Sequence, residues 1–147
     1  MNFVSTAELA PEVVEEFFED KWQELEDRDA LIEHGYFIEY NGEYKGYFAL
    51  SPVAEQTFWL KSLYLKQGVP AALPLTIIET ATALAKQKGG KNLFVYSHQE
   101  QLDTLLTMLQ FESQPDPSFA QQAPVENGTW WKLALPVEHQ QPVNFEE

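Results

Sequence analysis

The sequence predicts a mixed α/β domain: a mostly antiparallel sheet built around a central parallel strand–helix–strand unit, with helices on both faces. Two observations carry this prediction. Asn41-Gly42 joins two segments rich in aromatic and β-branched residues, which is the pattern of a tight antiparallel hairpin. Residues 57–65 and 92–96 are strand-like and enclose a helical pattern, so they should be parallel and joined by a right-handed crossover.

The N-terminal segment is predicted to be a short strand followed by one amphipathic helix. Residues 2–4 suit the strand, Ser5 and Thr6 are natural N-caps, and Pro11 fits a first helical turn. Apolar residues then recur at three- and four-residue steps to about residues 25–27. These residues are Val13, Val14, Phe17, Phe18, Trp22 and Leu25.

Three strands should follow this helix. Residues 36–40 and 44–50 form the two arms of the Asn41-Gly42 hairpin, and Pro52 is expected to end the second arm. The third strand, 57–65, is apolar on both faces near its end, as a central strand would be.

The second half of the chain alternates helix and strand. A helix should run from about residues 70–73 to Lys88 and stop at Gly89-Gly90, followed by a strand over 92–96. The sequence 97–100, Ser-His-Gln-Glu, has the pattern of a capping box that opens a leucine-rich helix. A loop over 114–128 and a final strand over 129–135 complete a single domain of residues 1–135, and 136–147 is predicted to be a disordered polar tail.

Composition and charge exclude several classes of function. The chain has no cysteine, which excludes disulfides and thiolate chemistry, and it has no run of the ~18–20 apolar residues that a membrane span needs. No secretory signal is visible, so a cytoplasmic location is expected. The formal net charge is −14, and residues 1–33 hold eleven Asp and Glu against Lys21 and Arg28. Such a chain should repel nucleic acid and anionic lipid and attract cationic partners.

The order strand, loop, helix, strand, helix over 57–111, closing on Leu109-Gln110-Phe111, resembles the acyl-CoA-binding half of the GNAT N-acetyltransferase family. The likeness in element order extends over about residues 36–135. It implies that acetyl-CoA is the cofactor, that the backbone of Leu63-Tyr64-Leu65 grips the pantetheine arm, and that the next loop presents amides to the pyrophosphate. The implied cofactor-binding residues are Leu63, Leu65, Gln67, Gly68, Val69, Ala71 and Ala72.

The loop departs from the family's pattern and is a degenerate pyrophosphate loop. It lacks the family's glycines, and Pro70 and Pro74 have no N–H to donate. Gly68 and its neighbours can still form a different anion nest, with Lys66 as the nearby cation. Two further departures lie in the last helix, where Leu106 replaces a tyrosine used as a general acid and Gln99 replaces an asparagine.

The residues that would perform catalysis are unknown from the sequence. The central strand holds no carboxylate, so the usual base position is empty, and Tyr64 and Tyr96 are the candidates for a general acid. Carboxylates on neighbouring strands or turns can relay a proton through water; these are Glu39, Glu43 and Glu55. The three histidines show no metal-ligand spacing, and no metal is expected.

Two functions therefore remain open. The first is an acyl-CoA-dependent N-acetyltransferase that acts on a small-molecule or cationic amine. The alternative is a catalytically inactive GNAT-fold binding or regulatory module that uses its acidic, aromatic surface. A small-molecule amine or a basic protein is the expected partner, and the chain can be a monomer or a homodimer.

Overall fold

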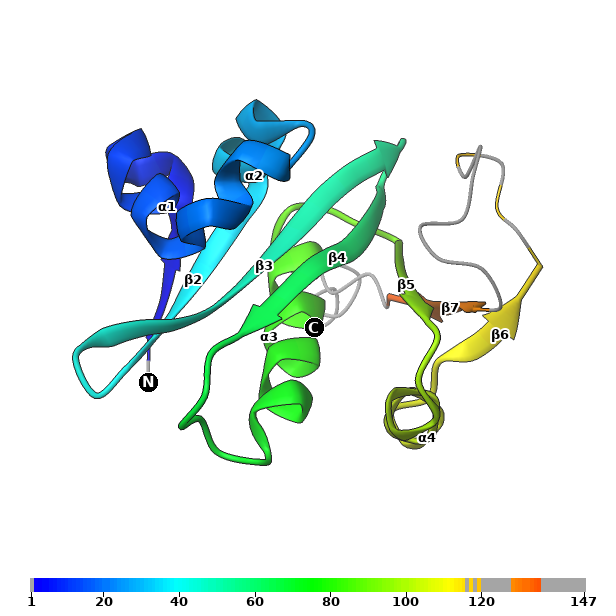
Figure 1. The fold of residues 1–147 in the computed structure, drawn as a ribbon. Helices are drawn as coiled ribbons and strands as arrows, with labels where there is room; N and C mark the ends of the chain where they lie inside the picture. The colour runs from blue at the N-terminus through cyan, green and yellow to red at the C-terminus, as the bar shows by residue number, and fades with distance from the viewer. Residues whose placement is uncertain (1, 116, 118, 120–127, 136–147) are drawn as a thin grey trace, which may run out of the picture. The chain divides into compact units, whose positions relative to one another are not determined.

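A computed structural model of the protein describes residues 2–115, 117, 119 and 128–135. Seven strands form one sheet in the order β1-β2-β3-β4-β5-β7-β6 (Figure 1). The pairs β1–β2, β2–β3, β5–β7 and β6–β7 are antiparallel, whereas β4 and β5 are parallel from Thr57↔Asn92 to Leu60↔Val95. The predicted mixed, mostly antiparallel sheet with a central parallel strand–helix–strand unit is confirmed.

The chain divides into two compact units. The N-terminal unit comprises Met1–Ser51 and Lys61–Leu73, and the C-terminal unit comprises Pro52–Leu60 and Pro74–Glu147. Both units contain parts of β3 (Glu43–Ala54) and β4 (Thr57–Leu65). The expectation of a single domain over 1–135 stays a prediction, and the expected tail, 136–147, lies outside the described residues.

The N-terminal unit begins with β1 (Asn2–Ser5), which pairs with β2 (Gly35–Tyr40), and β2 pairs in turn with β3. The predicted Asn-Gly hairpin is confirmed, because both turn residues have positive φ, 54° at Asn41 and 81° at Gly42. The helical segments between β1 and β2 are η1 (Thr6–Glu8), α1 (Pro11–Phe18), η2 (Glu19–Glu24) and α2 (Arg28–His34).

The single N-terminal helix of the sequence prediction was wrong. Glu19 follows the last residue of α1 and has a φ of 52°, and Asp27 precedes α2 and has a φ of 56°. A residue with positive φ cannot continue a right-handed helix, so the helical segment is interrupted at both positions. Pro11 does stand in the first turn of α1, but Ser5 makes no side-chain cap. The α2 helix was missed because its seven residues bury only Leu31 fully and carry almost no periodic signal.

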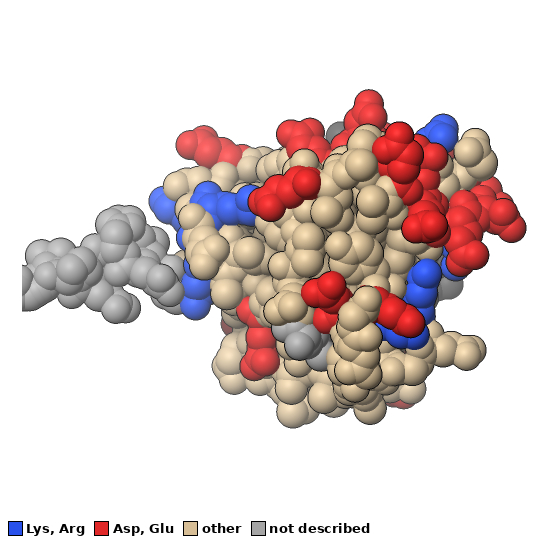
Figure 2. All heavy atoms as spheres, turned by 90° about the vertical axis from the view of Figure 1, so that its left-hand side faces the viewer, with Lys and Arg blue, Asp and Glu red and all other residues tan. Residues whose placement is uncertain are grey.

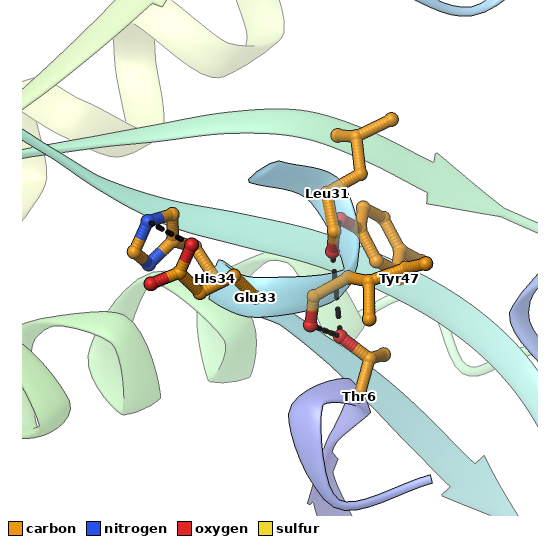
Figure 3. A network of polar contacts seen from close by, with 6 residues as sticks. Thr6, Leu31, Glu33, His34 and Tyr47 are labelled. Carbon is orange, nitrogen blue, oxygen red and sulfur yellow. Dashed lines mark hydrogen bonds and ion pairs between the residues drawn. The ribbon is translucent and has the colours of Figure 1, made fainter. Parts of the chain in front are cut away.

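Buried hydroxyl groups hold the C-terminal end of α2 in the N-terminal unit (Figure 3). The last four carbonyls of a helix have no partner within it. Here Tyr47 donates its hydroxyl to the Leu31 carbonyl at 2.6 Å, and Thr6 donates to the carbonyls of Leu31 and Ile32. Thr6 is thus a buried tertiary contact between η1 and α2, and it does not cap a helix as the sequence suggested.

The core of the N-terminal unit is aromatic and lies between the helices and β2–β3. Phe17 and Phe18 pack against the ring of Tyr47, with ring centroids 6.4 and 5.0 Å away. Gly35 makes this packing possible, because a Cβ at that position would lie 2.4 Å from both the Tyr47 ring and the Leu31 carbonyl. The buried residues of this core are Val14, Phe17, Phe18, Trp22, Leu31, Phe37, Tyr47 and Ala49.

Pro52 does not end β3, contrary to the prediction. The last β2–β3 pair is Gly35↔Ala49, so Pro52 lies beyond the end of β2. A strand can contain a proline at a position where no neighbouring strand needs a hydrogen bond from its N–H group. The strand therefore continues to Ala54 and turns into β4.

The C-terminal unit contains α3 (Leu73–Gln87, whose first residue belongs to the N-terminal unit), β5 (Asn92–Ser97), α4 (Glu100–Met108), β6 (Glu112–Gln114) and β7 (Thr129–Ala134). The predicted stop of α3 at Gly89-Gly90 is confirmed. Gly89 has a φ of 80°, and the Gly90 and Gly89 amides donate to the carbonyls of Ala85 and Lys86, closing a Schellman motif.

The start of α4 and the strand β6 differ from the prediction. Ser97 is the last residue of β5, and its hydroxyl bonds only Gln99, so Gln99 is the N-cap and no capping box forms. β6 was missed because three residues are too few for a strand pattern. It pairs with β7 from Glu112↔Lys132 to Gln114↔Trp130.

Candidate cofactor-binding site

The end of β4 in the N-terminal unit presents apolar side chains to solvent. Leu63 and Leu65 are 42% and 38% exposed, and they alternate with Tyr64, whose side chain points into the core. Ser62 precedes them with a φ of 58°, a left-handed conformation that is uncommon in a strand. The β4–β5 register ends two residues earlier, at Leu60, and no β4–β5 pair lies beyond it among the described residues.

The β4–α3 loop (residues 66–72) continues directly from these leucines. Its start is fixed by a 2.8 Å hydrogen bond from the Lys66 amide to the Lys45 carbonyl, and its end by a turn in which the Leu73 amide donates to the Pro70 carbonyl. Gln67, Gly68, Ala71 and Ala72 are exposed and Val69 is partly buried. Within the described chain, the amides of Gln67, Gly68 and Val69 donate no backbone hydrogen bond. The loop therefore has three backbone amides that could bind an anion, although it lacks the glycines of the family's loop.

The structure adds a cation that the sequence did not place at this loop. A Cβ on Gly68 would lie 4.0 Å from the Nζ of Lys45, a residue of β3. The sequence pointed only to Lys66, whose Nζ lies 4.4 Å from the centroid of the Phe17 ring. Sequence reasoning missed Lys45 because the hairpin pattern does not say which β3 residue reaches the loop after β4.

Tyr64, the first candidate acid, is partly buried in the aromatic core of the N-terminal unit. Its ring lies 5.0 Å from Phe18 and 6.3 Å from Tyr47, centroid to centroid. The Nζ of Lys21 lies 5.6 Å from the ring centroid. Its hydroxyl makes no hydrogen bond that the structure shows within the described residues.

Tyr47, which the sequence did not single out, is the tyrosine whose acidity the fold changes. Burial raises the pKa of its hydroxyl far above the ordinary value of 10.0, and the neighbouring Tyr64 raises it further. Its hydroxyl donates a hydrogen bond to the Leu31 carbonyl. Tyr47 is thus a structural hydroxyl and not an acid for catalysis.

Tyr96, the second candidate acid, belongs to the C-terminal unit. Its hydroxyl accepts a 3.0 Å hydrogen bond from the Gly128 amide, and its ring lies 5.0 Å from that of Trp130. Trp130 is buried at the centre of an aromatic cluster and, among the described residues, its indole N–H has no hydrogen-bond partner. The rings around it are Trp59, Phe94, Tyr96 and Phe119.

The neighbouring residues Trp130 and Trp131 of β7 point to opposite faces of the sheet. Trp131 donates its indole N–H to the carboxylate of Asp103 on α4 at 3.1 Å, whereas Trp130 packs in the aromatic cluster. Both tryptophans thus have structural roles in the C-terminal unit.

The carboxylates proposed as relays do not converge on one point in the N-terminal unit. Glu39 accepts a hydrogen bond from the Asn2 amide group, and Glu43 forms a 3.1 Å ion pair with Lys45. Glu55 lies in the C-terminal unit, exposed in the β3–β4 turn.

The α4 helix ends at Leu109-Gln110-Phe111 in a residue of left-handed conformation that is not a glycine. Gln110 has a φ of 75°, and the amides of Phe111 and Gln110 donate to the carbonyls of Leu106 and Thr107. Leu106, at the position of the family's tyrosine, is completely buried and supplies packing alone. The structure thus brings an apolar core residue to the position where the family resemblance implies an acid.

Acidic side chains gather on the helical segments of the N-terminal unit (Figure 2). All eleven Asp and Glu of residues 1–33 are exposed. Four of them, Glu26, Asp27, Asp29 and Glu33, line a hollow of about 710 Å³ at the start of α2, together with Leu25, Arg28 and Ala30. Within the described ranges, no group of three or more His, Asp or Glu has an arrangement that could hold a metal ion. No described helix is long and apolar enough to cross a membrane.

Neither a protein-family model nor a curated protein gives a significant sequence match to this chain. Solved structures do match it. A Klebsiella pneumoniae protein assigned as an acyl-CoA N-acyltransferase is 19% identical, with a TM-score of 0.65, over 91% of this chain and 95% of that one. The N-acetylglutamate synthase of Neisseria gonorrhoeae, complexed with coenzyme A and N-acetyl-glutamate, is 15% identical with a TM-score of 0.65, over 85% of this chain and 32% of that one.

A third similar structure is the N-acetyltransferase PseH of Campylobacter jejuni in complex with acetyl coenzyme A. It is 10% identical, with a TM-score of 0.60, over 92% of this chain and 99% of that one. Together with a strand order that contains one parallel pair at β4–β5, these likenesses establish the architecture. The chain has the fold of the GNAT acyl-CoA N-acetyltransferases.

Proposed function

We propose that the protein is an acyl-CoA-dependent N-acetyltransferase that binds acetyl-CoA and acts on a small-molecule or cationic amine. One observation carries the proposal: β4 ends in two exposed leucines and runs directly into a loop with open amides. An exposed apolar strand end beside an anion-accepting loop suits a ligand with an apolar arm and phosphates. Coenzyme A or acetyl coenzyme A in similar structures supports this assignment.

The cofactor would supply the acetyl thioester, and the chain would position it. In this arrangement the backbone of residues 63–65 would bond the amides of the pantetheine arm, and the open amides of Gln67, Gly68 and Val69 would face the phosphates, with Ala71 and Ala72 next to them in the loop. Tyr64 lies within residues 63–65 and is the first candidate for the acid that protonates the leaving thiolate. Tyr96 is the second candidate for this role.

An amine acceptor fits the charge of the molecule. An amine in its protonated form is attracted by the exposed carboxylates of the N-terminal unit, which raise its local concentration. The amine must then lose a proton before it attacks the thioester. Because β4 carries no carboxylate, we propose that a water relay to Glu39 or Glu43, which belong to the same unit, removes that proton.

Titration of acetyl-CoA into the purified protein by calorimetry, at low and at physiological salt, tests the proposal. We expect binding at micromolar strength. Leu65→Ser should weaken it severalfold because it removes apolar contact with the pantetheine arm. The matched control is Met108→Ser, an exposed apolar residue of α4 that should leave binding unchanged.

Two results would sink the acetyltransferase proposal. One is the absence of binding at millimolar acetyl-CoA. The other is binding that Met108→Ser weakens as much as Leu65→Ser does. If binding is found, a screen of amines that monitors release of the free thiol identifies the acceptor.

The acidic hollow at the start of α2 favours a second candidate, an inactive GNAT-fold binding or regulatory module with a basic partner. Four carboxylates there face solvent beside a single arginine. Prolines at 70 and 74 and the empty base position on β4 fit the loss of CoA chemistry. Binding of Lys- and Arg-rich peptides without binding of acetyl-CoA would establish this function. Both proposed functions suit a cytoplasmic protein that is a monomer or a homodimer.

A further inference from the structure

The cation nearest the exposed turn of the β4–α3 loop comes from β3, an element outside that loop. Lys45 places its Nζ 4.0 Å from where a Cβ on Gly68 would lie. Its own carbonyl accepts the Lys66 amide, so the backbone of Lys45 is fixed to the first residue of the loop. The Lys45 side chain is only 26% exposed. A lysine with a buried stem and its ammonium group at a loop of open amides is already ordered before any ligand binds.

The charge of the molecule makes such a cation necessary for an anionic ligand. With a net charge of −14, the chain repels a phosphate at long range, and open amides alone carry only partial charges. Lys66 is the other cation of the loop, but its Nζ lies over the ring of Phe17. Lys45 is therefore the full positive charge aimed at Gly68.

Resting on the proposed function, we propose that Lys45 is a phosphate-binding residue for the diphosphate or 3′-phosphate of coenzyme A. It compensates for the missing glycines of the pyrophosphate loop by supplying a full positive charge. The ligand class is an organic phosphate ester attached to an apolar arm. The arm lies on Leu63 and Leu65, and the phosphate lies between Gly68 and the ammonium group of Lys45.

Glu43 competes with a phosphate for the ammonium group of Lys45. Its carboxylate lies 3.1 Å from the Nζ of Lys45 and is 69% exposed, so the ion pair is at the surface and weak. A phosphate that binds Lys45 competes with this carboxylate. Removing the charge of Glu43 should therefore strengthen phosphate binding, whereas removing the charge of Lys45 should weaken it. These opposite signs distinguish phosphate binding from a merely structural ion pair, in which both changes would act alike.

The test measures the affinity of four proteins for three ligands by calorimetry. The proteins are the wild type, Lys45→Met, Glu43→Gln and Lys88→Met. The last variant is the matched control, because it removes the same charge from an exposed residue at the opposite end of α3. The ligands are coenzyme A, its dephospho form without the 3′-phosphate, and pantetheine, which has no phosphate.

We expect Lys45→Met to weaken coenzyme A binding about tenfold or more, the size of one lost hydrogen bond between charged groups. Lys88→Met should change it less than about twofold, and Glu43→Gln should tighten it. Pantetheine should bind the wild type and Lys45→Met equally. A tenfold loss that persists with the dephospho form assigns Lys45 to the diphosphate, and one that disappears assigns it to the 3′-phosphate.

The proposal and the function on which it rests fail in different ways. If the wild type binds no coenzyme A at all, the acetyltransferase proposal and the role of Lys45 fall together. If the wild type binds and Lys45→Met binds equally well, the role of Lys45 alone is overturned. Equal weakening of coenzyme A and pantetheine by Lys45→Met would also overturn it, because that pattern reports damage to the fold. Lys45→Arg should restore binding and so shows that the charge matters.

Discussion

At the scale of single residues, Tyr47 connects the parts of the N-terminal unit. Its hydroxyl satisfies a terminal carbonyl of α2, its ring packs under Phe18, and it can take this place only because Gly35 has no side chain. A buried hydroxyl that donates to a carbonyl cannot ionise without breaking its hydrogen bond. Burial is the main physical cause of its raised pKa, and the neighbouring Tyr64 raises the pKa further.

The raised pKa of Tyr47 predicts a loss of stability in alkaline solution. As the pH rises above the ordinary tyrosine value of 10.0, the unfolded chain releases this proton while the folded chain retains it. The free energy of unfolding should then fall by about 1.4 kcal/mol per pH unit because of this one group. Chemical denaturation at pH 9, 10 and 11 measures the slope.

Tyr47→Phe is the comparison that isolates this group. It should lower stability at pH 8 by about 1–2 kcal/mol, because the Leu31 carbonyl loses its best donor. Above pH 10 its slope should be shallower than that of the wild type, since only the other groups still titrate. Equal slopes in the two proteins would show that Tyr47 ionises normally in the folded state.

At the scale of elements, α3 and α4 end in the same way with different residues. Each ends in a Schellman motif whose C′ residue has positive φ, 80° at Gly89 and 75° at Gln110. Glycine reaches this conformation without strain, whereas a residue with a Cβ costs about 1 kcal/mol. The end of α4 therefore carries a strain that the end of α3 lacks.

This contrast predicts that Gln110→Gly stabilises the protein by about 0.5–1 kcal/mol and that Gly89→Ala destabilises it by about 1 kcal/mol. Thermal and chemical denaturation measure both effects. The control is Gln101→Gly, an exposed position inside α4, where glycine should destabilise by about 1 kcal/mol. A destabilising Gln110→Gly would mean that the Gln110 side chain stabilises this end through contacts that outweigh its backbone strain.

At the scale of the whole molecule, the dominant property is charge. The eleven acids of residues 1–33 are all exposed and have only Lys21 and Arg28 among them, so the folded chain repels itself. Self-repulsion destabilises a compact state more than an expanded one, and salt screens it over about 10 Å at 0.1 M.

Raising sodium chloride from about 10 mM to about 0.5 M should therefore stabilise the protein by about 1 kcal/mol, a rise of about 2–4 °C in Tm. Differential scanning calorimetry checks this. The double variant Glu15→Gln/Glu16→Gln should be more stable at low salt and respond less to salt, because both carboxylates lie on the exposed acidic face of α1. A Tm that falls with salt would show that attractive ion pairs prevail over repulsion.

The sequence by itself determined those features that depend on local chemistry. The Asn-Gly turn, the β4–α3–β5 unit and the glycine stop of α3 were predicted because turn conformation, strand period and helix capping are set by neighbouring residues. The short elements α2 and β6 were not, since seven or three residues hold too little pattern to outweigh their surroundings.

The tertiary structure alone decided which distant side chains meet. Thr6 reaches the end of α2, Tyr47 buries its hydroxyl there, and Lys45 comes from β3 to the loop after β4. The sequence located that loop and its implied cofactor residues, but it pointed only to Lys66 as the nearby cation and not to Lys45. Strand register helps to set these contacts, and it depends on how elements pack, which no local pattern in the sequence encodes.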